Sequence, residues 1–303
     1  MSPEPTLRQL RHFLSLAEHC HFSRAAEACL ITQSSLSASI REMEFVLGTQ
    51  LFERTKRSVM LTPLGRDMIP LARDVLLRLD DLTDLVQTAG GPLRGDLRLG
   101  VIPTVGPFLL PRTLPGLRKA WPDLRLYLHE DQTARLLRQL DEGRLDLVLL
   151  ALPYKTGKFE SLAFAEDPLL AVFPRGHTLS EFETMTPTRL SRDAVLMLDD
   201  GNCLSDQTLA IGRFKTTADL ATATSLHTLV QMVANGLGVT VLPKMAIDAG
   251  ILRGLKLDVR PFSSRKASRR LALVWRKSSR RADEFRIIAA YLGDELGTPV
   301  RRD

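Results

Sequence analysis

Cys203 has a reactive side chain and stands at the predicted start of a helix. The chain has three cysteines, Cys20, Cys29 and Cys203, and none stands in a C-x-x-C pair or a Cys/His zinc spacing, which argues against a metal site or a disulfide framework. Cys203 follows a predicted turn at residues 200–202 and opens a helix predicted over residues 204–210. Unpaired amide groups at a helix start favour a thiolate, which is the form that reacts with oxidants. Cys203 is therefore a candidate redox residue, and the alternative is a small buried apolar side chain.

The rest of the sequence shows no arrangement typical of an enzyme. The six histidines are scattered along the chain, and no Ser/His/Asp or paired-carboxylate arrangement is recognisable. We therefore expect no catalytic activity, no bound metal and no cofactor.

Composition indicates a globular protein of more than one domain. The chain has 303 residues, of which 44% are apolar and 25% charged, and this length suits two or three domains. No apolar run is long enough to span a bilayer, and the N-terminus lacks a secretory signal, so we expect a cytoplasmic protein with no membrane partner. The net charge of +6 is compatible with nucleic acid. However, residues 1–66 carry eight basic against six acidic side chains and residues 251–303 fourteen against six, so the case for DNA rests on a motif.

The first 50 residues predict two short helices joined by a tight break. Ser23 is the expected N-cap of a helix over residues 24–29, and residues 30–33 form the break before a helix over residues 34–44 with Gly48 as its C-cap. The buried stripe of this second helix is expected to comprise Leu36, Ile40, Met43 and Leu47. Its opposite face carries short or cationic side chains, which allow close approach to base edges and phosphates. This pattern favours a helix-turn-helix, and the alternative is a helical hairpin with a serine-rich solvent face.

A basic β-hairpin predicted over residues 51–61 supports the DNA interpretation, because such a wing places cations beside the phosphate backbone. We expect contacts with double-stranded DNA from the two helices and the wing. The candidate residues are Ser23, Arg24, Thr32, Gln33, Ser34, Ser35, Ser37, Arg41, Arg54, Lys56 and Arg57.

A long helix is predicted to follow, with Thr62 as N-cap and Pro63 at its first position. An apolar heptad seam runs along it, formed by Met68, Ala72, Val75, Leu79, Leu82 and Val86. A single helix cannot bury such a seam, so we expect it to pair with a second copy of the chain. Charges at Ala72 or Val75 should disrupt that pairing most. Gly90-Gly91-Pro92 ends the helix and marks a domain boundary.

Beyond residue 95 the pattern alternates between strands and helices, which predicts an α/β domain. The expected strands are residues 97–102, 124–129, 145–150, 169–173, 195–198, 239–242 and 271–275, with helices that include residues 133–140, 225–235 and 282–292. The predicted domains are a winged helix-turn-helix over residues 1–62, a linker helix over 63–92 and a sensing domain over 93–303.

The N-terminal motifs resemble the signature of the LysR-type transcriptional regulators. They are Phe-Ser-Arg-Ala-Ala at residues 22–26, Thr-Gln-Ser-Ser-Leu-Ser at 32–37, Ile-Arg-Glu-Met-Glu at 40–44, Leu-Phe-Glu-Arg at 51–54 and Leu-Thr-Pro-Leu-Gly at 61–65. Ser34 is a departure, since the family usually has proline there. The resemblance implies a sensing domain of two Rossmann-like lobes, as in periplasmic binding proteins, with a cleft between them. It also implies a homotetramer built from helix-paired dimers, and RNA polymerase as a partner.

Four segments of the sensing domain, residues 100–107, 126–133, 199–207 and 223–229, are similar to OxyR, the peroxide-sensing branch of the family. That resemblance implies that Cys203 reacts with hydrogen peroxide, that Thr104 and Thr133 supply hydroxyls to the bound peroxide, and that Asp206 lies close by. Gly212 stands where the branch has its second, resolving cysteine, and no cysteine follows Cys203.

Without a resolving cysteine, oxidation should stop at sulfenic acid or be capped by a small thiol or a second subunit. Cys20 and Cys29 are expected to pack in the core of the DNA-binding module. Asn202 replaces a histidine of better-known members, which bears on the reactivity of the thiol. The main alternative is a LysR-type regulator that binds a small metabolite in the interlobe cleft, with Cys203 inert. A solute-binding protein and a thiol peroxidase rank lower.

Overall fold

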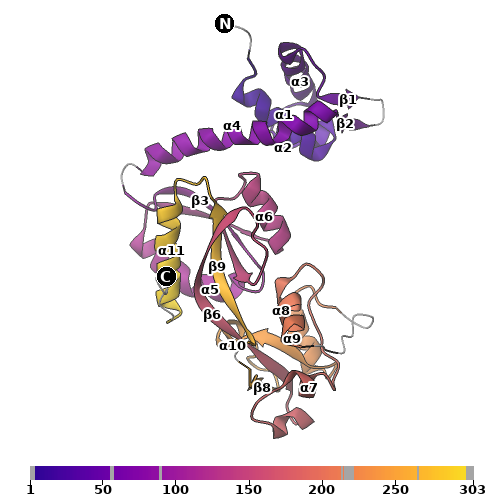
Figure 1. Ribbon diagram of the computed structural model, residues 1–303, viewed down its shortest axis with the longest axis vertical. Helices are drawn as coiled ribbons and strands as arrows, with labels where there is room; N and C mark the ends of the chain where they lie inside the picture. The colour runs from indigo at the N-terminus through magenta and orange to yellow at the C-terminus, as the bar shows by residue number, and fades with distance from the viewer. Residues whose placement is uncertain are drawn as a thin grey trace. The chain divides into compact units, whose positions relative to one another are not determined.

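The computed structural model describes residues 4–54, 58–88, 91–212, 214, 222–264 and 266–297. The chain divides into two compact units, Met1–Gln87 and Thr88–Asp303. Each unit has its own cluster of buried apolar side chains, and Figure 1 labels most of the elements of both. Lys56 and Arg57, two candidate phosphate contacts, lie outside the described residues.

The first unit is a winged helix-turn-helix module, as predicted. Its elements before the long helix are α1 (Leu7–His19), α2 (Phe22–Ala28), α3 (Gln33–Leu47), β1 (Phe52–Arg54) and β2 (Val59–Leu61). The two strands pair in antiparallel register. One core joins the helices and the hairpin, because Phe13, Ile40 and Phe52 are all nearly inaccessible to solvent and the rings of Phe13 and Phe52 lie 5.6 Å apart.

The start of α2 corrects the predicted cap. The side chain of His21, not that of Ser23, accepts the hydrogen bond from the backbone amide of Arg24. Ser23 lies inside the helix, and its hydroxyl donates to Oε1 of Gln33 at 2.9 Å. Ser23 therefore connects the first turns of α2 and α3.

The ends of α3 agree with the prediction to within a few residues. Thr32 caps the helix by accepting from the amide of Ser35, so α3 begins at Gln33, one residue earlier than predicted. Gly48 ends it in the left-handed conformation, with φ of 66°, which glycine adopts at little cost. Leu36, Ile40 and Met43 are buried as predicted, but the expectation for Leu47 is wrong. Leu47 is 38% exposed because the last turn of α3 extends past the core.

The long helix α4 (Pro63–Thr88) begins as predicted, since the hydroxyl of Thr62 accepts from the amide of Gly65 at 3.0 Å. Its apolar seam divides into two parts. Ala72 is 3% exposed and belongs to the core of the first unit, whereas Val75 is 46% and Leu82 63% exposed. Ala72 is therefore already covered within one chain, and the expectation that it lies on a pairing surface is wrong.

The second unit is built on a mixed, seven-stranded sheet with the strand order β4-β3-β5-β9-β6-β7 and with β8 paired to β6. The strands are β3 (Gly95–Val101), β4 (Leu124–Glu130), β5 (Leu147–Leu152), β6 (Phe159–Pro174), β7 (Thr240–Pro243), β8 (Leu257–Pro261) and β9 (Ser268–Arg276). The α-helices are α5 (Gly106–Ala120), α6 (Thr133–Asp141), α7 (Pro187–Leu190), α8 (Cys203–Ile211), α9 (Leu226–Ala234), α10 (Lys244–Asp248) and α11 (Ala282–Glu295), and a 3₁₀ turn, η1, covers Thr178–Glu181.

The sheet spans two lobes, which confirms the predicted architecture. β6 has 16 residues. Its first part, from Phe159 to Pro168, pairs with β9, and its last part, from Leu169 to Pro174, pairs with β7 and β8. The first lobe contains β3, β4, β5, α5, α6 and α11, and the second contains α7 to α10 with β7 and β8, so that β6 passes from one lobe into the other (Figure 1).

Several elements differ from the predicted pattern. β8 and the first ten residues of β6, from Phe159 to Pro168, were not predicted as strands. α5 was not among the helices named from the sequence, and Pro111 and Pro115 lie inside it, although proline removes a backbone hydrogen bond from a helix. Residues 195–198 were expected to form a strand, but Val195 and Leu198 make only isolated bridges to Val239 and Ala223.

Candidate functional site

The N-terminal turn of α3 presents short polar side chains to solvent. Gln33, Ser34 and Ser35 are all exposed. The hydroxyl oxygen of Thr32 lies 3.0 Å from that of Ser34 and 2.8 Å from that of Ser35. These local bonds fix the side chains while their outer surfaces stay accessible, which suits contact with base edges or phosphates.

The other candidate DNA contacts differ in their exposure and in the bonds that they make within the module. Arg41 is exposed and Ser37 half-buried, whereas exposed Arg24 donates to the carbonyl of His19 at 3.3 Å. Arg54 forms an ion pair with Glu44, and its guanidinium lies 5.3 Å from the ring centroid of Phe22. A phosphate bound by Arg54 would therefore compete with Glu44.

Two partly buried polar contacts hold α3 against α1. Nδ1 of His12 lies 2.7 Å from the hydroxyl of Ser39, and Nε2 of Gln9 donates to Glu42 at 3.1 Å. Burial, and secondarily the charge of Arg8, lowers the pKa of His12. The neutral imidazole is therefore the form that suits this contact.

Cys203 is the first residue of α8, as expected, and is only 4% exposed. The turn before it contains Gly201 with φ of +88°, a conformation that favours glycine. The N-cap residue Asn202 makes no side-chain bond to the amides of α8. Its Nδ2 donates instead to the carbonyl of Asp199 at 3.1 Å. The first amides of α8 therefore remain without a side-chain cap beside the thiol.

Thr133 and Thr104 are both buried, at 1% and 2% exposure. Thr133 begins α6, and its hydroxyl makes no hydrogen bond of ordinary geometry within the described part of the chain, although it lies near enough to Cys203 to favour the thiolate. A buried hydroxyl without a partner is costly. The Thr133 hydroxyl is therefore a group to which a small polar ligand or a water molecule could bind.

Arg269 of β9 is a site residue that sequence reasoning missed. Its guanidinium donates to the hydroxyl of Thr104 at 3.0 Å and to the carbonyl of Thr104 at 2.9 Å. Nε donates to Asp167 at 3.0 Å, and this pair is buried. Because the Thr104 hydroxyl accepts from Arg269, its own proton is available to another acceptor. The sequence offers little signal for this role, because Arg269 stands beside Arg270 at the edge of the apolar run of residues 271–275.

Gln207 was also missed. It lies four residues after Cys203 on α8, so both side chains occupy one face of the helix. Gln207 is 4% exposed. Its Nε2 donates to the carbonyl of Ala151 at 3.2 Å, and its Oε1 has no hydrogen-bond partner among the described residues. The site thus contains a second buried acceptor available to a ligand.

The electrostatics of the site oppose one another. Burial raises the pKa of the Cys203 thiol, while the charge of Arg269 and the hydroxyl of Thr133 act to lower it. Asp206, expected in the pocket, is exposed, and its charge raises the same pKa. The net direction is upward, which is opposite to the direction expected from the position of the thiol at a helix start.

The other cysteines and Gly212 have surroundings that bear on the oxidised product. Cys20 is exposed and Cys29 half-buried, so the expectation that they pack in the core is wrong. Gly212 follows α8, and a Cβ atom placed there would collide with the Cβ of Pro187. The space beside residue 212 is therefore filled. Residues 215–221, which follow, lie outside the described residues.

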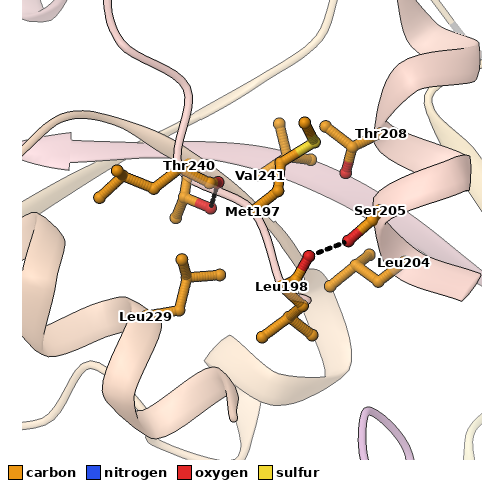
Figure 2. A pocket seen from close by; sticks show the side chains of 9 residues that line it. Met197, Leu198, Leu204, Ser205, Thr208, Leu229, Thr240 and Val241 are labelled. Atoms are coloured by element: carbon orange, nitrogen blue, oxygen red, sulfur yellow. Dashed lines mark hydrogen bonds between the residues drawn. The ribbon is translucent and has the colours of Figure 1, made fainter. Parts of the chain in front are cut away.

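A shallow hollow lies within the second lobe, on another part of α8. It is partly open to solvent and leaves no room for a buried water molecule. Its lining residues are Leu196, Met197, Leu198, Leu204, Ser205, Thr208, Leu229, Thr240 and Val241. Figure 2 shows that Ser205 and Thr240 turn their hydroxyls toward backbone oxygens, namely those of Leu198 at 2.8 Å and Leu196 at 2.9 Å. Cys203 does not line this hollow, which we regard as a packing defect.

No helix in the described ranges has the length and apolar character needed to cross a membrane.

Comparison with known proteins defines the class. Residues 7–66 match the family model described as the bacterial regulatory helix-turn-helix protein of the lysR family, and residues 90–297 match the LysR substrate binding domain. The chain therefore belongs to the LysR family of transcriptional regulators. Its members bind DNA and form oligomers, and they are regulators rather than enzymes.

Within that family the chain is closely related to OxyR. It is 42% identical over 244 residues to the DNA-binding transcriptional dual regulator OxyR of Escherichia coli, covering 80% of each chain. It is 40% identical over 276 residues to the hydrogen peroxide-inducible genes activator of Dickeya chrysanthemi, covering 90% of each.

Solved structures of OxyR are similar over nearly the whole chain. A full-length OxyR variant from Pseudomonas aeruginosa has a TM-score of 0.76 at 33% identity, with 96% of this chain and 98% of that chain covered. A peroxide-bound OxyR mutant from Corynebacterium glutamicum has a TM-score of 0.67 at 35% identity, with 98% and 94% covered.

Proposed function

We propose that this chain is a peroxide-responsive regulator of transcription and that Cys203 is its sensor. The observation that carries the proposal is the buried hydroxyl of Thr133, which lies beside the buried thiol and has no other partner among the described residues. The hydroxyl of Thr104, which Arg269 orients, and Oε1 of Gln207 are further groups that could bind peroxide oxygens. The names of the relatives, which are hydrogen peroxide-inducible activators, support the same ligand.

The reaction requires the thiolate. The Cys203 sulfur attacks one peroxide oxygen, so that an S–O bond forms as the O–O bond breaks. The departing hydroxide takes a proton and becomes water, and the sulfur is oxidised by two electrons to sulfenic acid. Thr133 and Thr104 can donate to and accept from peroxide, and the charge of Arg269 stabilises the anionic sulfur.

The oxidised state uses a single cysteine of the sensing domain. A resolving cysteine is absent at Gly212, and the side chain of Pro187 fills the adjacent space. Sulfenic acid therefore persists or condenses with a small thiol, which releases water and leaves a mixed disulfide. Either product adds volume and polarity at the start of α8, between the two lobes, and can bias their packing.

In this proposal the first unit binds DNA. We place the start of α3 in the major groove through Gln33, Ser34, Ser35 and Ser37, with Lys56 and Arg57 on phosphates. The exposed apolar residues Val75 and Leu82 of α4 are the candidates for pairing with a second copy, within a tetramer that engages RNA polymerase.

A regulator of the same family that binds a metabolite in the cleft remains the second candidate. The observation in its favour is that burial raises the pKa of Cys203, as expected for an unreactive thiol. Thr104 and Thr133 would serve such a ligand equally well.

Peroxide treatment of the purified full-length chain separates the two candidates. We expect intact-mass spectrometry and dimedone labelling to find a modified Cys203 and no disulfide within the sensing domain. Cys203→Ser should abolish the peroxide effect on DNA binding, whereas Cys20→Ser and Cys29→Ser should preserve it. A response that survives in Cys203→Ser leaves the metabolite regulator as the function.

A further inference from the structure

Gln132 connects the backbone segments that carry Thr133 and Cys203. It is the N-cap residue of α6 and directly precedes Thr133. Its Nε2 donates to the carbonyl oxygen of Asp200 at 3.2 Å, three residues before the thiol. This bond joins the first lobe to the turn that leads into α8 of the second lobe.

The Gln132 side chain also packs directly on Gly201. A Cβ atom placed on Gly201 would lie 2.8 Å from Oε1 of Gln132 and 3.0 Å from its Cδ. The amide group thus lies directly on the turn, and a Cβ atom at residue 201 would have to push it aside. The hydrogen bond and this close packing together hold the turn of residues 200–202 against the start of α6.

The burial of the Cys203 thiol agrees with a turn that is held closed over it. Cys203 is 4% and Thr133 1% exposed, so an oxidant reaches the sulfur only if it is small or if the turn moves away. Hydrogen peroxide has two heavy atoms, whereas an organic hydroperoxide carries an alkyl or aryl group that must also enter. A side chain that holds the turn closed discriminates between them by size.

We propose that Gln132 is a specificity-determining residue, which holds the turn of residues 200–202 closed over Cys203 and so admits hydrogen peroxide in preference to bulky organic hydroperoxides. This inference rests on the proposed peroxide function. It adds a selection step before the chemistry, because both oxidants convert the same thiolate to sulfenic acid. The co-product is water from one oxidant and an alcohol from the other.

The test compares two oxidants on the full-length chain. Cys20→Ser and Cys29→Ser are introduced first, because Cys20 is exposed and would react as well. Rates of Cys203 oxidation are then measured with hydrogen peroxide and with cumene hydroperoxide. We expect Gln132→Ala to raise the rate with cumene hydroperoxide about tenfold, in the range of steric discrimination by enzyme pockets, and to change the rate with hydrogen peroxide less than about threefold.

Gln139→Ala is the matched control. It makes the same chemical change on the same helix, but Nε2 of Gln139 lies 3.1 Å from Nε2 of His129 and not at the turn. We expect it to keep the selectivity of the parent, and equal melting temperatures will show that both variants are folded. Equal selectivity in Gln132→Ala and the parent, or a tenfold rise for both oxidants, overturns the proposal.

A second pair of reagents separates this failure from failure of the proposed function. Alkylation by iodoacetamide and by the larger N-ethylmaleimide reports access to the thiol without any peroxide chemistry. If Gln132→Ala speeds the larger reagent selectively while hydrogen peroxide leaves Cys203 unmodified in the parent, the cover exists but the peroxide function is wrong. If the alkylation rates keep the parent ratio, the cover itself is wrong.

Discussion

The exposed first turn of α3 and the Cys203 site are held by hydrogen bonds that span different distances along the sequence. At α3, Ser23 and Gln33 are ten residues apart and Thr32 and Ser35 three. At the Cys203 site, Arg269 bonds Thr104 across 165 residues. The first turn of α3 is thus a local structure, whereas the Cys203 site exists only when distant segments are folded together. Substitutions at the Cys203 site should therefore reduce stability, and those at the proposed DNA-binding surface of α3 should reduce DNA binding alone.

The largest effect should come from Arg269→Met. This change removes a buried charge and leaves Asp167 without its partner, which costs about 3–5 kcal/mol of unfolding free energy. Arg270→Met is the matched control, because Arg270 is the exposed neighbour on the same strand and should change stability by less than about 0.5 kcal/mol. Urea unfolding of the second unit, followed by tryptophan fluorescence, measures both. Equal losses would contradict the assigned role of Arg269.

Ser35→Glu tests the other side of the comparison. An acidic residue at the start of α3 should repel phosphates and weaken specific DNA binding by about 1–3 kcal/mol. The stability of the fold should not decrease, since negative charge is favourable at a helix N-terminus.

Lys56→Ala should weaken binding to all DNA sequences and reduce the slope of log binding constant against log salt concentration by about one unit. Fluorescence anisotropy at several salt concentrations distinguishes the two, and a loss of unfolding free energy in Ser35→Glu would show that this surface is not merely local.

Val75→Asp should act on assembly, because Val75 is exposed on α4 while Ala72 is not. We expect the dimer to weaken by roughly tenfold or more, the size of a substantial interface substitution, with little change in the unfolding of the first unit. Thr83→Asp places the same charge on an exposed position of α4 outside the predicted seam and should leave the dimer intact. Sedimentation equilibrium that finds Val75→Asp fully dimeric would remove α4 as the pairing element.

The smallest effect concerns pH and the first unit alone. Burial lowers the pKa of His12, so the folded module favours the neutral imidazole. As pH falls below the ordinary value of about 6.5, the unfolded chain binds a proton before the folded one does, and stability decreases. His12→Gln should flatten this dependence, and His19→Gln on the same helix should retain it. Unfolding free energies between about pH 5 and 8 provide the measurement.

The separation along the sequence between bonded residues also explains what could be predicted from the sequence. Thr32, Gly48 and Thr62 mark helix ends through bonds to their own neighbourhood, so the module was predicted to within a few residues. The position of Cys203 at the start of α8 was predicted for the same reason. Apart from the cap of α2, which His21 and not Ser23 supplies, errors arose where packing decided the outcome. Leu47 was assigned to a core that ends one turn earlier, and Ala72 to an interface although its own module covers it.

The charges near the C-terminus could not be interpreted from composition. Residues 251–303 appear strongly basic, yet Arg269 and Arg281 are buried and paired with Asp167 and Glu284. Part of that excess charge therefore stabilises the fold and offers nothing to a partner at the surface. No periodicity reports such pairs, because Asp167 lies 102 residues from Arg269.

The continuity of β6 has a consequence for how the sensing domain melts. Its hydrogen-bond ladders belong to both lobes, with β9 on the first and with β7 and β8 on the second. If one lobe unfolded alone, half of β6 would lose its partner strands while the other half stayed paired. The unfolding transitions of the two lobes are therefore coupled. Calorimetry of the second unit should therefore find a single cooperative endotherm. A chain cut between Pro168 and Leu169 should yield two fragments, neither of which folds without the other.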